Sequence, residues 1–175
     1  MFKRVAAVLV ASAAILGLAA EGASAASPRP TQSIVEIASA NGSFGTLLTA
    51  VGCADPGVAA ALTSGDQYTV FAPTDAAFAA AGLDSSNVCT ALPQSTLTSV
   101  LLYHVTGGRR SANSVLPPKA GKSRTVSTLL EGQVLKVSKA GVISTTSGGS
   151  ATIVAPNISA TNGVIHVIDS VLLPG

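Results

Sequence analysis

The hydrophobic pattern changes its period near residue 110, and this change limits the chain to folds that combine helices with a sheet. Before that point apolar residues recur at helical spacing; Phe44, Leu47, Leu48 and Val51 fall at i, i+3, i+4 and i+7. After Arg110 short runs of β-favouring residues alternate with glycine-containing turns. The sequence therefore predicts an α+β fold.

Capping and stop signals divide the helical part. Residues 33–36 (Ser-Ile-Val-Glu) form a capping box, in which the serine accepts a backbone N–H and the glutamate reaches back. We expect Ser43 to cap the next helix, and Asp55 before Pro56 to cap the one after it. The predicted helices run over residues 33–41, 43–52, 55–65, 75–81 and from 93 to about 103.

One strand is predicted among the helices, at residues 68–72, and it stops at Pro73. Further strands are predicted at residues 124–129, 133–138, 142–145, 151–155 and 164–173. Turns such as Ala140-Gly141 and Asn162-Gly163 separate them, which favours an antiparallel meander. Apolar residues fill both faces of residues 164–168, so this strand should be central and buried on both sides.

The N-terminal 25 residues have the layout of a secretory signal peptide. A basic start at Lys3 and Arg4 precedes an apolar run, and Ala23-Ser24-Ala25 fits a cleavage site. The run is shorter than the ~20 apolar residues of a membrane anchor. We predict a cleaved signal at residues 1–25, a linker at 26–32 and one domain at 33–175, in a protein exported to the periplasm or the exterior.

The two cysteines agree with export. An oxidising compartment favours pairing an even number of cysteines, so we predict a disulfide between Cys53 and Cys89. The alternative is a catalytic thiol at Cys89, but no histidine lies near it in the sequence.

Composition argues against several classes of function. Only 10% of the residues are charged, and the aromatic fraction is 3%. Nucleic-acid binding needs clustered Lys and Arg, and base stacking needs aromatic rings. Two histidines 62 residues apart argue against a metal site, and the common catalytic and phosphate-binding motifs are missing. We therefore predict no catalytic residues, no metal and no cofactor.

Three segments resemble the signature blocks of fasciclin-like domains. They are residues 69–78 (TVFAPTDAAF), residues 101–105 (LLYHV) and residues 162–174 (NGVIHVIDSVLLP), in family order. The resemblance covers about residues 33–174. It implies a fasciclin-like fold, in which N-terminal helices pack on a wedge of antiparallel strands shaped as a β-sandwich or partial barrel. It also implies adhesion or extracellular interaction rather than catalysis.

Most motif residues can be explained as fold determinants. We assign this structural role to Thr69, Phe71, Pro73, Thr74, Asp75, Phe78, Asn162, Gly163, His166 and Asp169. The family also implies a recognition role for the Tyr-His region, so Tyr103 and His104 are candidate binding residues. Arg109 and Arg110, with Lys119 and Lys122, form a candidate basic rim, for which ordinary solvation is the alternative explanation.

The leading hypothesis is a secreted, monomeric, non-catalytic module that binds a surface protein or glycan. The first alternative is a carrier of a small apolar ligand in a groove between sheet and helices. The second is a small secreted hydrolase that uses His104 or His166.

Overall fold

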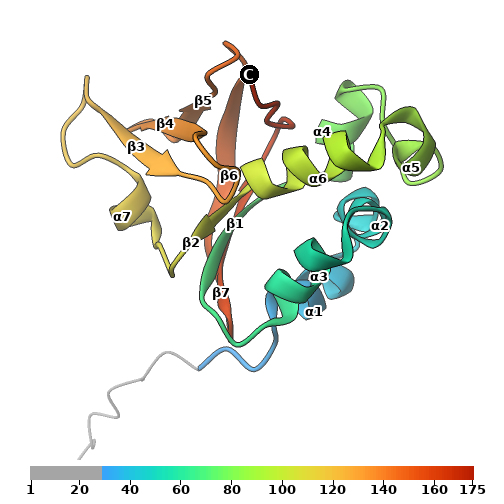
Figure 1. Ribbon diagram of the computed structural model, residues 1–175. Helices are drawn as coiled ribbons and strands as arrows, with labels where there is room; N and C mark the ends of the chain where they lie inside the picture. The colour runs from blue at the N-terminus through green and yellow to red at the C-terminus, as the bar shows by residue number, and fades with distance from the viewer. Residues whose placement is uncertain (1–28) are drawn as a thin grey trace, which may run out of the picture.

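A curled sheet of strands forms one side of the molecule, and helices cover the other side (Figure 1). The computed structural model describes residues 29–175, so the predicted signal peptide and residues 26–28 of the predicted linker lie outside the described residues. The strands are β1 (Tyr68–Pro73), β2 (Val105–Gly107), β3 (Ser123–Ser127), β4 (Val134–Ser138), β5 (Val142–Ser144), β6 (Ser150–Ala160) and β7 (Gly163–Ile168). The helices are α1 (Ile34–Asn41), α2 (Gly45–Cys53), α3 (Pro56–Thr63), α4 (Asp75–Ala80), α5 (Val88–Ala91), α6 (Gln94–Tyr103) and α7 (Ala112–Val115).

The strand order in the sheet is β2-β1-β7-β6-β5-β4-β3. From β3 to β7 each strand pairs antiparallel with the next one in the chain, which confirms the predicted meander. The expectation that all strands are antiparallel was wrong at one place: β1 pairs with β7 in parallel, with Tyr68 opposite Gly163 and Pro73 opposite Ile168. The reason is that β7 lies between β6 and β1, and β1 comes from a much earlier part of the chain.

The two edges of the sheet approach each other without forming a ladder. Thr106 on β2 donates its hydroxyl to the Ser127 carbonyl at 2.6 Å, and the Leu129 N–H bonds to the Val105 carbonyl at 2.8 Å. The sheet is therefore curled and unclosed, as a partial barrel is.

Strands β1 and β7 are buried on both faces, so each contributes to two core clusters. Val70 and Ile165 point into a cluster shared with helices α1–α3 and α6, where Phe44 and Leu97 are also buried. The opposite faces contribute to a second cluster, made with β3–β6: Phe71, Tyr103, Val115, Val126, Leu135, Val137, Ile143, Ala151, Ile168 and Leu172. The prediction of a central strand buried on both sides is confirmed.

The cap of α2 differs from the prediction. Ser43 is not its N-cap; Phe44 holds that position and offers no side-chain acceptor. Instead the Asp75 carboxylate, at the start of α4, accepts the N–H groups of Gly45 at 3.2 Å and Thr46 at 2.7 Å. A residue of another element thus satisfies these free donors, while Thr74 caps α4 through the Ala77 N–H as predicted.

Other differences are local. The last strand ends at Ile168 rather than at residue 173, because Asp169 turns back to accept the Thr152 N–H at 2.7 Å. Helices α5 and α7, of four residues each, were not predicted. The disulfide between Cys53 and Cys89 is present and ties α2 to α5. Within residues 29–175, no helix is long and apolar enough to cross a membrane.

Gly163 lies where the backbone of β7 comes close to the backbone of β1, so its substitution tests the parallel pairing. A Cβ atom there would come within 2.0 Å of the Tyr68 carbonyl oxygen. We expect Gly163→Ala to lower the free energy of unfolding by about 3 kcal/mol, because backbone atoms must move. Urea unfolding followed by circular dichroism measures this change.

The matched control is Gly52→Ala in α2, where an added Cβ meets nothing within 4 Å. Alanine favours the helix over glycine by about 0.5–1 kcal/mol, so this variant should be at least as stable as the wild type. Equal stabilities for the two variants would contradict the close approach.

Candidate binding site

The central motif residues Tyr103 and His104 lie where α6 ends and β2 begins, and both are buried. Tyr103 is 0% exposed and His104 is 2% exposed. The two neighbouring side chains enter different regions: Tyr103 packs in the second core cluster, and His104 lines a pocket under the helices. Neither side chain is exposed on the surface of the molecule.

Both ring nitrogens of His104 are occupied by the backbone. Nε2 lies 3.0 Å from the Leu172 amide, which can only donate, so Nε2 is the acceptor. Nδ1 therefore carries the proton and donates to the Val100 carbonyl at 2.7 Å. The ring joins the end of α6 to the C-terminal segment, with its donor and acceptor on opposite edges, as the sequence analysis expected.

Burial lowers the pKa of His104 to about 4, although its bond to the Val100 carbonyl acts in the opposite direction. A proton on Nε2 would place two donors face to face, because the Leu172 N–H already points at that atom. His104 is thus neutral at physiological pH.

His166 on β7 has a similar environment. Its ring is buried, stacks on Phe71 with centroids 5.7 Å apart, and bonds to the Arg110 carbonyl through Nε2 at 2.9 Å. Nδ1 accepts the Asn157 N–H at 3.3 Å. Burial lowers the pKa of His166 as well. Among the described residues, no serine or threonine hydroxyl bonds to either histidine, so the hydrolase hypothesis gains no nucleophile–base pair.

The Arg109-Arg110 pair follows β2 and anchors the connection to α7. Arg109 is exposed, and its Nη1 donates to the Ala160 carbonyl at 2.7 Å. Arg110 is half-buried, and its backbone N–H donates to the Thr69 hydroxyl at 2.8 Å. The structure therefore does not combine the four predicted binding residues into one surface, since Tyr103 and His104 lie in the core.

Other motif residues hold separate elements together. The Asn162 side chain accepts the Ile34 N–H at 2.9 Å and donates to the Leu62 carbonyl at 2.6 Å, which joins the turn before β7 to α1 and α3. The Thr69 hydroxyl donates to the Gly108 carbonyl at 2.8 Å. The Tyr103 hydroxyl donates to the Val134 carbonyl at 3.2 Å. These contacts support the structural role that the sequence analysis gave to most of the motif residues.

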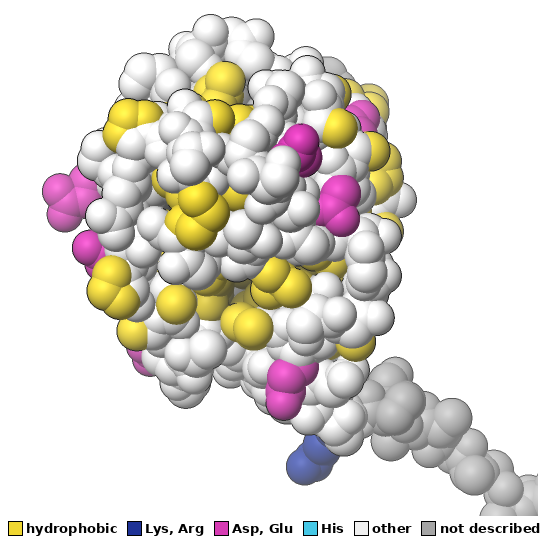
Figure 2. Space-filling model, turned by 90° about the vertical axis from the view of Figure 1, so that its right-hand side faces the viewer, with side chains coloured by type: hydrophobic (Ala, Val, Ile, Leu, Met, Phe, Trp, Pro, Cys, Tyr) yellow, Lys and Arg dark blue, Asp and Glu magenta, His cyan; other side chains and the backbone are white. Residues whose placement is uncertain are grey.

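The surface over the helices offers a different candidate site. Hydrophobic side chains gather in a hollow on this face, and most of the charged side chains around them are Asp or Glu (Figure 2). We call this hollow the apolar groove; it lies between α1, α2 and α3 on one side and β1, β2 and the end of α6 on the other. Its lining residues are Ile34, Val35, Ala38, Leu47, Leu48, Val51, Val58, Leu62, Val70, Leu101, His104 and Val105.

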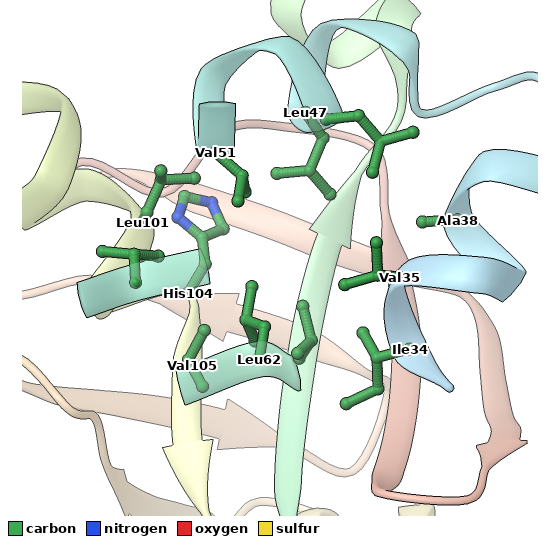
Figure 3. Close-up of a pocket in the computed structure, with 12 residues that line it drawn as sticks. Ile34, Val35, Ala38, Leu47, Val51, Leu62, Leu101, His104 and Val105 are labelled. Atoms are coloured by element: carbon green, nitrogen blue, oxygen red, sulfur yellow. The ribbon is translucent and has the colours of Figure 1, made fainter. Parts of the chain in front are cut away.

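The groove is narrow and chemically uniform. Its volume is about 40 Å³, and the only polar side chain in its lining is His104, whose two nitrogens are already bonded (Figure 3). Val35, Leu48 and Val51 are half-buried, and the other nine lining residues are buried. A site of this kind offers dispersion contacts and an escape from water, but no free hydrogen-bonding group to a ligand.

The sequence predicts a groove between the sheet and the helices lined by Leu, Val and Ala, but not which residues line it. The available signal was the excess of apolar positions on the first three helices, where more residues face inward than one packed helix face requires. Only the tertiary structure shows which of them stay partly open.

The comparisons agree with this fold. The family model of the fasciclin domain matches residues 42–174. The chain is 40% identical over 149 residues to the protein sll1483 of Synechocystis, covering 81% of this chain and 73% of that protein. It is 37% identical over 152 residues to the immunogenic protein MPB70 of Mycobacterium bovis, covering 82% and 70%.

A solved structure shares the architecture at lower identity. A FAS1 domain pair of the insect cell adhesion molecule Fasciclin I aligns with a TM-score of 0.60 and 23% identity. The alignment covers 76% of this chain and 46% of the insect chain, so this chain spans about half of that domain pair. At this identity the likeness supports the fold alone.

The burial of His104 predicts a loss of stability in mild acid. The unfolded chain takes up a proton near pH 6.5, whereas the folded chain resists until about pH 4. The stabilisation is therefore complete above pH 6.5 and disappears progressively as the pH falls to 4. We expect His104 to account for a decrease of about 3 kcal/mol in the free energy of unfolding, measured by urea titration at a series of pH values.

A His104→Gln variant isolates the contribution of His104 to the pH dependence. Its free energy of unfolding should depend less on pH than that of the wild type over the same range. The NMR signal of the His104 ring gives a direct check. A titration midpoint near 6.5 in the folded protein would show that the ring is not held neutral.

Proposed function

We propose that this chain, which belongs to the fasciclin domain family, is a secreted, non-catalytic module that binds an extracellular partner through its apolar groove. The observation that carries the proposal is the groove itself, because it is an apolar hollow on a surface face whose lining has no free polar group. Binding of an apolar anchor needs no reactive side chain.

The size of the groove indicates what can enter it. A volume of about 40 Å³ equals roughly three water-sized spheres, at about 11–12 Å³ each. This space suits the end of one aliphatic or aromatic side chain. An anchor side chain that fills an apolar pocket and excludes water commonly supplies much of the affinity of a protein interface.

Export supports an extracellular partner. The predicted signal peptide at residues 1–25 and the disulfide between Cys53 and Cys89 both fit an oxidising compartment outside the cytoplasm. Adhesion at the surface of the exporting cell is the role we propose for this chain, because the fasciclin domain family to which it belongs is known for adhesion.

Carriage of a small apolar ligand is the second candidate function, favoured by the same lining. The volume restricts it to a fragment of a few carbon atoms unless α1–α3 move away from the sheet. Native mass spectrometry of protein isolated from its own source separates the two functions. A bound mass in every preparation would support carriage, and consistently ligand-free spectra would remove it.

Filling the groove tests the leading proposal. Ala38 lines the groove from α1, so Ala38→Leu should place a larger side chain in the space that the anchor needs. We expect capture of partners from the surface fraction of the source cell to fall about tenfold or more, since one buried side chain contributes about 1.5–3 kcal/mol. Quantitative mass spectrometry of material retained on immobilised protein measures the loss.

The matched control is Ala40→Leu, the same change on the exposed side of the same helix. It should retain the wild-type set of partners. Thermal unfolding must show both variants folded, and Ala38→Val provides a smaller filling change if the leucine disturbs α1. Equal retention by Ala38→Leu and Ala40→Leu would remove the groove from the binding mechanism.

A further inference from the structure

The charges of this chain are divided along its sequence. Residues 29–108 contain five acidic residues and one basic residue, whereas residues 109–175 contain seven basic residues and two acidic ones. A nearly neutral protein thus has an acidic helical half and a basic strand half. Figure 2 shows the acidic half, where Asp and Glu surround the apolar groove.

We propose that the basic half binds an anionic polysaccharide at one end of the β3–β4 hairpin. The basic end, as we call it, consists of Lys119, Lys122 and Lys139. Ser123 is opposite Ser138 in the ladder, so Lys122 and Lys139, one step beyond, face each other across the two strands. Lys122 and Lys139 line a surface notch of about 650 Å³, together with Ser123 and Ser138.

The basic end is partly preorganised. Lys139 donates through Nζ to the Pro118 carbonyl at 2.7 Å, which holds its ammonium group beside the loop before β3 and leaves two N–H donors for an anion. The Arg124 guanidinium donates to the Ser114 carbonyl and fastens α7 to β3. Arg124 therefore adds positive charge near the basic end but is engaged in a structural contact.

The two carboxylate side chains of the strand half, Glu131 and Asp169, lie away from the basic end. Glu131 is in the turn at the other end of the hairpin, about 17 Å away along the five residues of β3. Asp169 follows β7 and accepts the Thr152 N–H, so its carboxylate lies at β6, two strand spacings or about 10 Å from β4. Both distances exceed the Debye length of about 8 Å at physiological salt.

The chemistry of this surface favours a polysaccharide over nucleic acid or membrane. Binding of single-stranded nucleic acid uses exposed aromatic rings. In residues 29–175 four of the five aromatic side chains are buried, and the fifth, the half-buried Tyr68 on β1, is not among the residues of the notch. Adsorption to a membrane needs exposed apolar side chains, and the large ones, Val154 and Leu173, are not among the residues of the notch. Ammonium groups and serine hydroxyls remain, and they suit sulfate or carboxylate groups on a flexible glycan.

The basic end lies away from the apolar groove, so a glycan bound there would leave the groove accessible. The β3–β4 hairpin lies at the left of Figure 1, and helices α1 and α3 lie at the lower right, across the sheet. One domain could therefore hold a glycan at one surface and a protein at another. The glycan site does not depend on the groove and can be tested separately.

The experiment measures binding to heparin, a sulfated polysaccharide, with neutral dextran and a thymidine oligonucleotide as comparison probes. The Lys119→Gln/Lys122→Gln variant should bind heparin about tenfold more weakly than the wild type. Arg29→Gln/Arg109→Gln removes the same charge elsewhere and should change the affinity less than about twofold. Raising NaCl from about 50 to about 200 mM should weaken wild-type binding roughly tenfold or more.

The site is supported if heparin binds, dextran does not, and only the lysine variant loses affinity. Equal losses in the two variants would show that net charge alone is responsible and would overturn the site. Absence of heparin binding at low salt would also overturn it. Oligonucleotide binding as tight as heparin binding would reject the choice of a glycan. All four changed residues are on the surface, and circular dichroism confirms that the variants fold.

Discussion

The parallel pairing of β1 with β7 is the contact on which the rest of the structure depends. Both strands are buried on both faces, so this ladder separates the two core clusters and contributes side chains to each. Strand β2 pairs with the other edge of β1, with Val105 opposite Val70. The three sequence motifs therefore occupy neighbouring strands in the middle of the molecule. The side chains on these strands are mostly buried because the motifs themselves build the interior that the helices and the meander cover.

Local patterns predicted the parts of this fold that local interactions determine. The capping box at residues 33–36, the Thr74 cap and the hairpins of the meander all depend on residues within a few positions of one another. The partner of β1 could not be predicted in this way, because no nearby residue encodes a pairing between Tyr68 and Gly163. The prediction of the α2 cap was wrong for the same reason. Ser43 has the right residue type, but the carboxylate that accepts the first N–H groups of α2 belongs to Asp75 of α4.

The candidate site shows the same limit. The motifs suggested Tyr103 and His104 as binding residues, but both side chains are buried and hydrogen-bonded in the interior. The apolar groove has no motif, since its lining consists of ordinary Val, Leu, Ile and Ala residues from six elements. Its existence depends on how completely three short helices cover the sheet. A groove lined by ordinary apolar residues can be recognised only when the burial of each residue is known.

The place of β7 in the chain also has a consequence for how the protein is made. Strand β1 is synthesised long before its parallel neighbour, since 95 residues separate Tyr68 from Gly163, and the ladder must wait until β7 has been made. Until then the central ladder lacks one of its strands and both core clusters are incomplete, so the nascent chain has no stable sheet to close. Contacts between such distant segments form slowly. A chain built in this order cannot complete either core cluster until two strands that are far apart in the sequence have met.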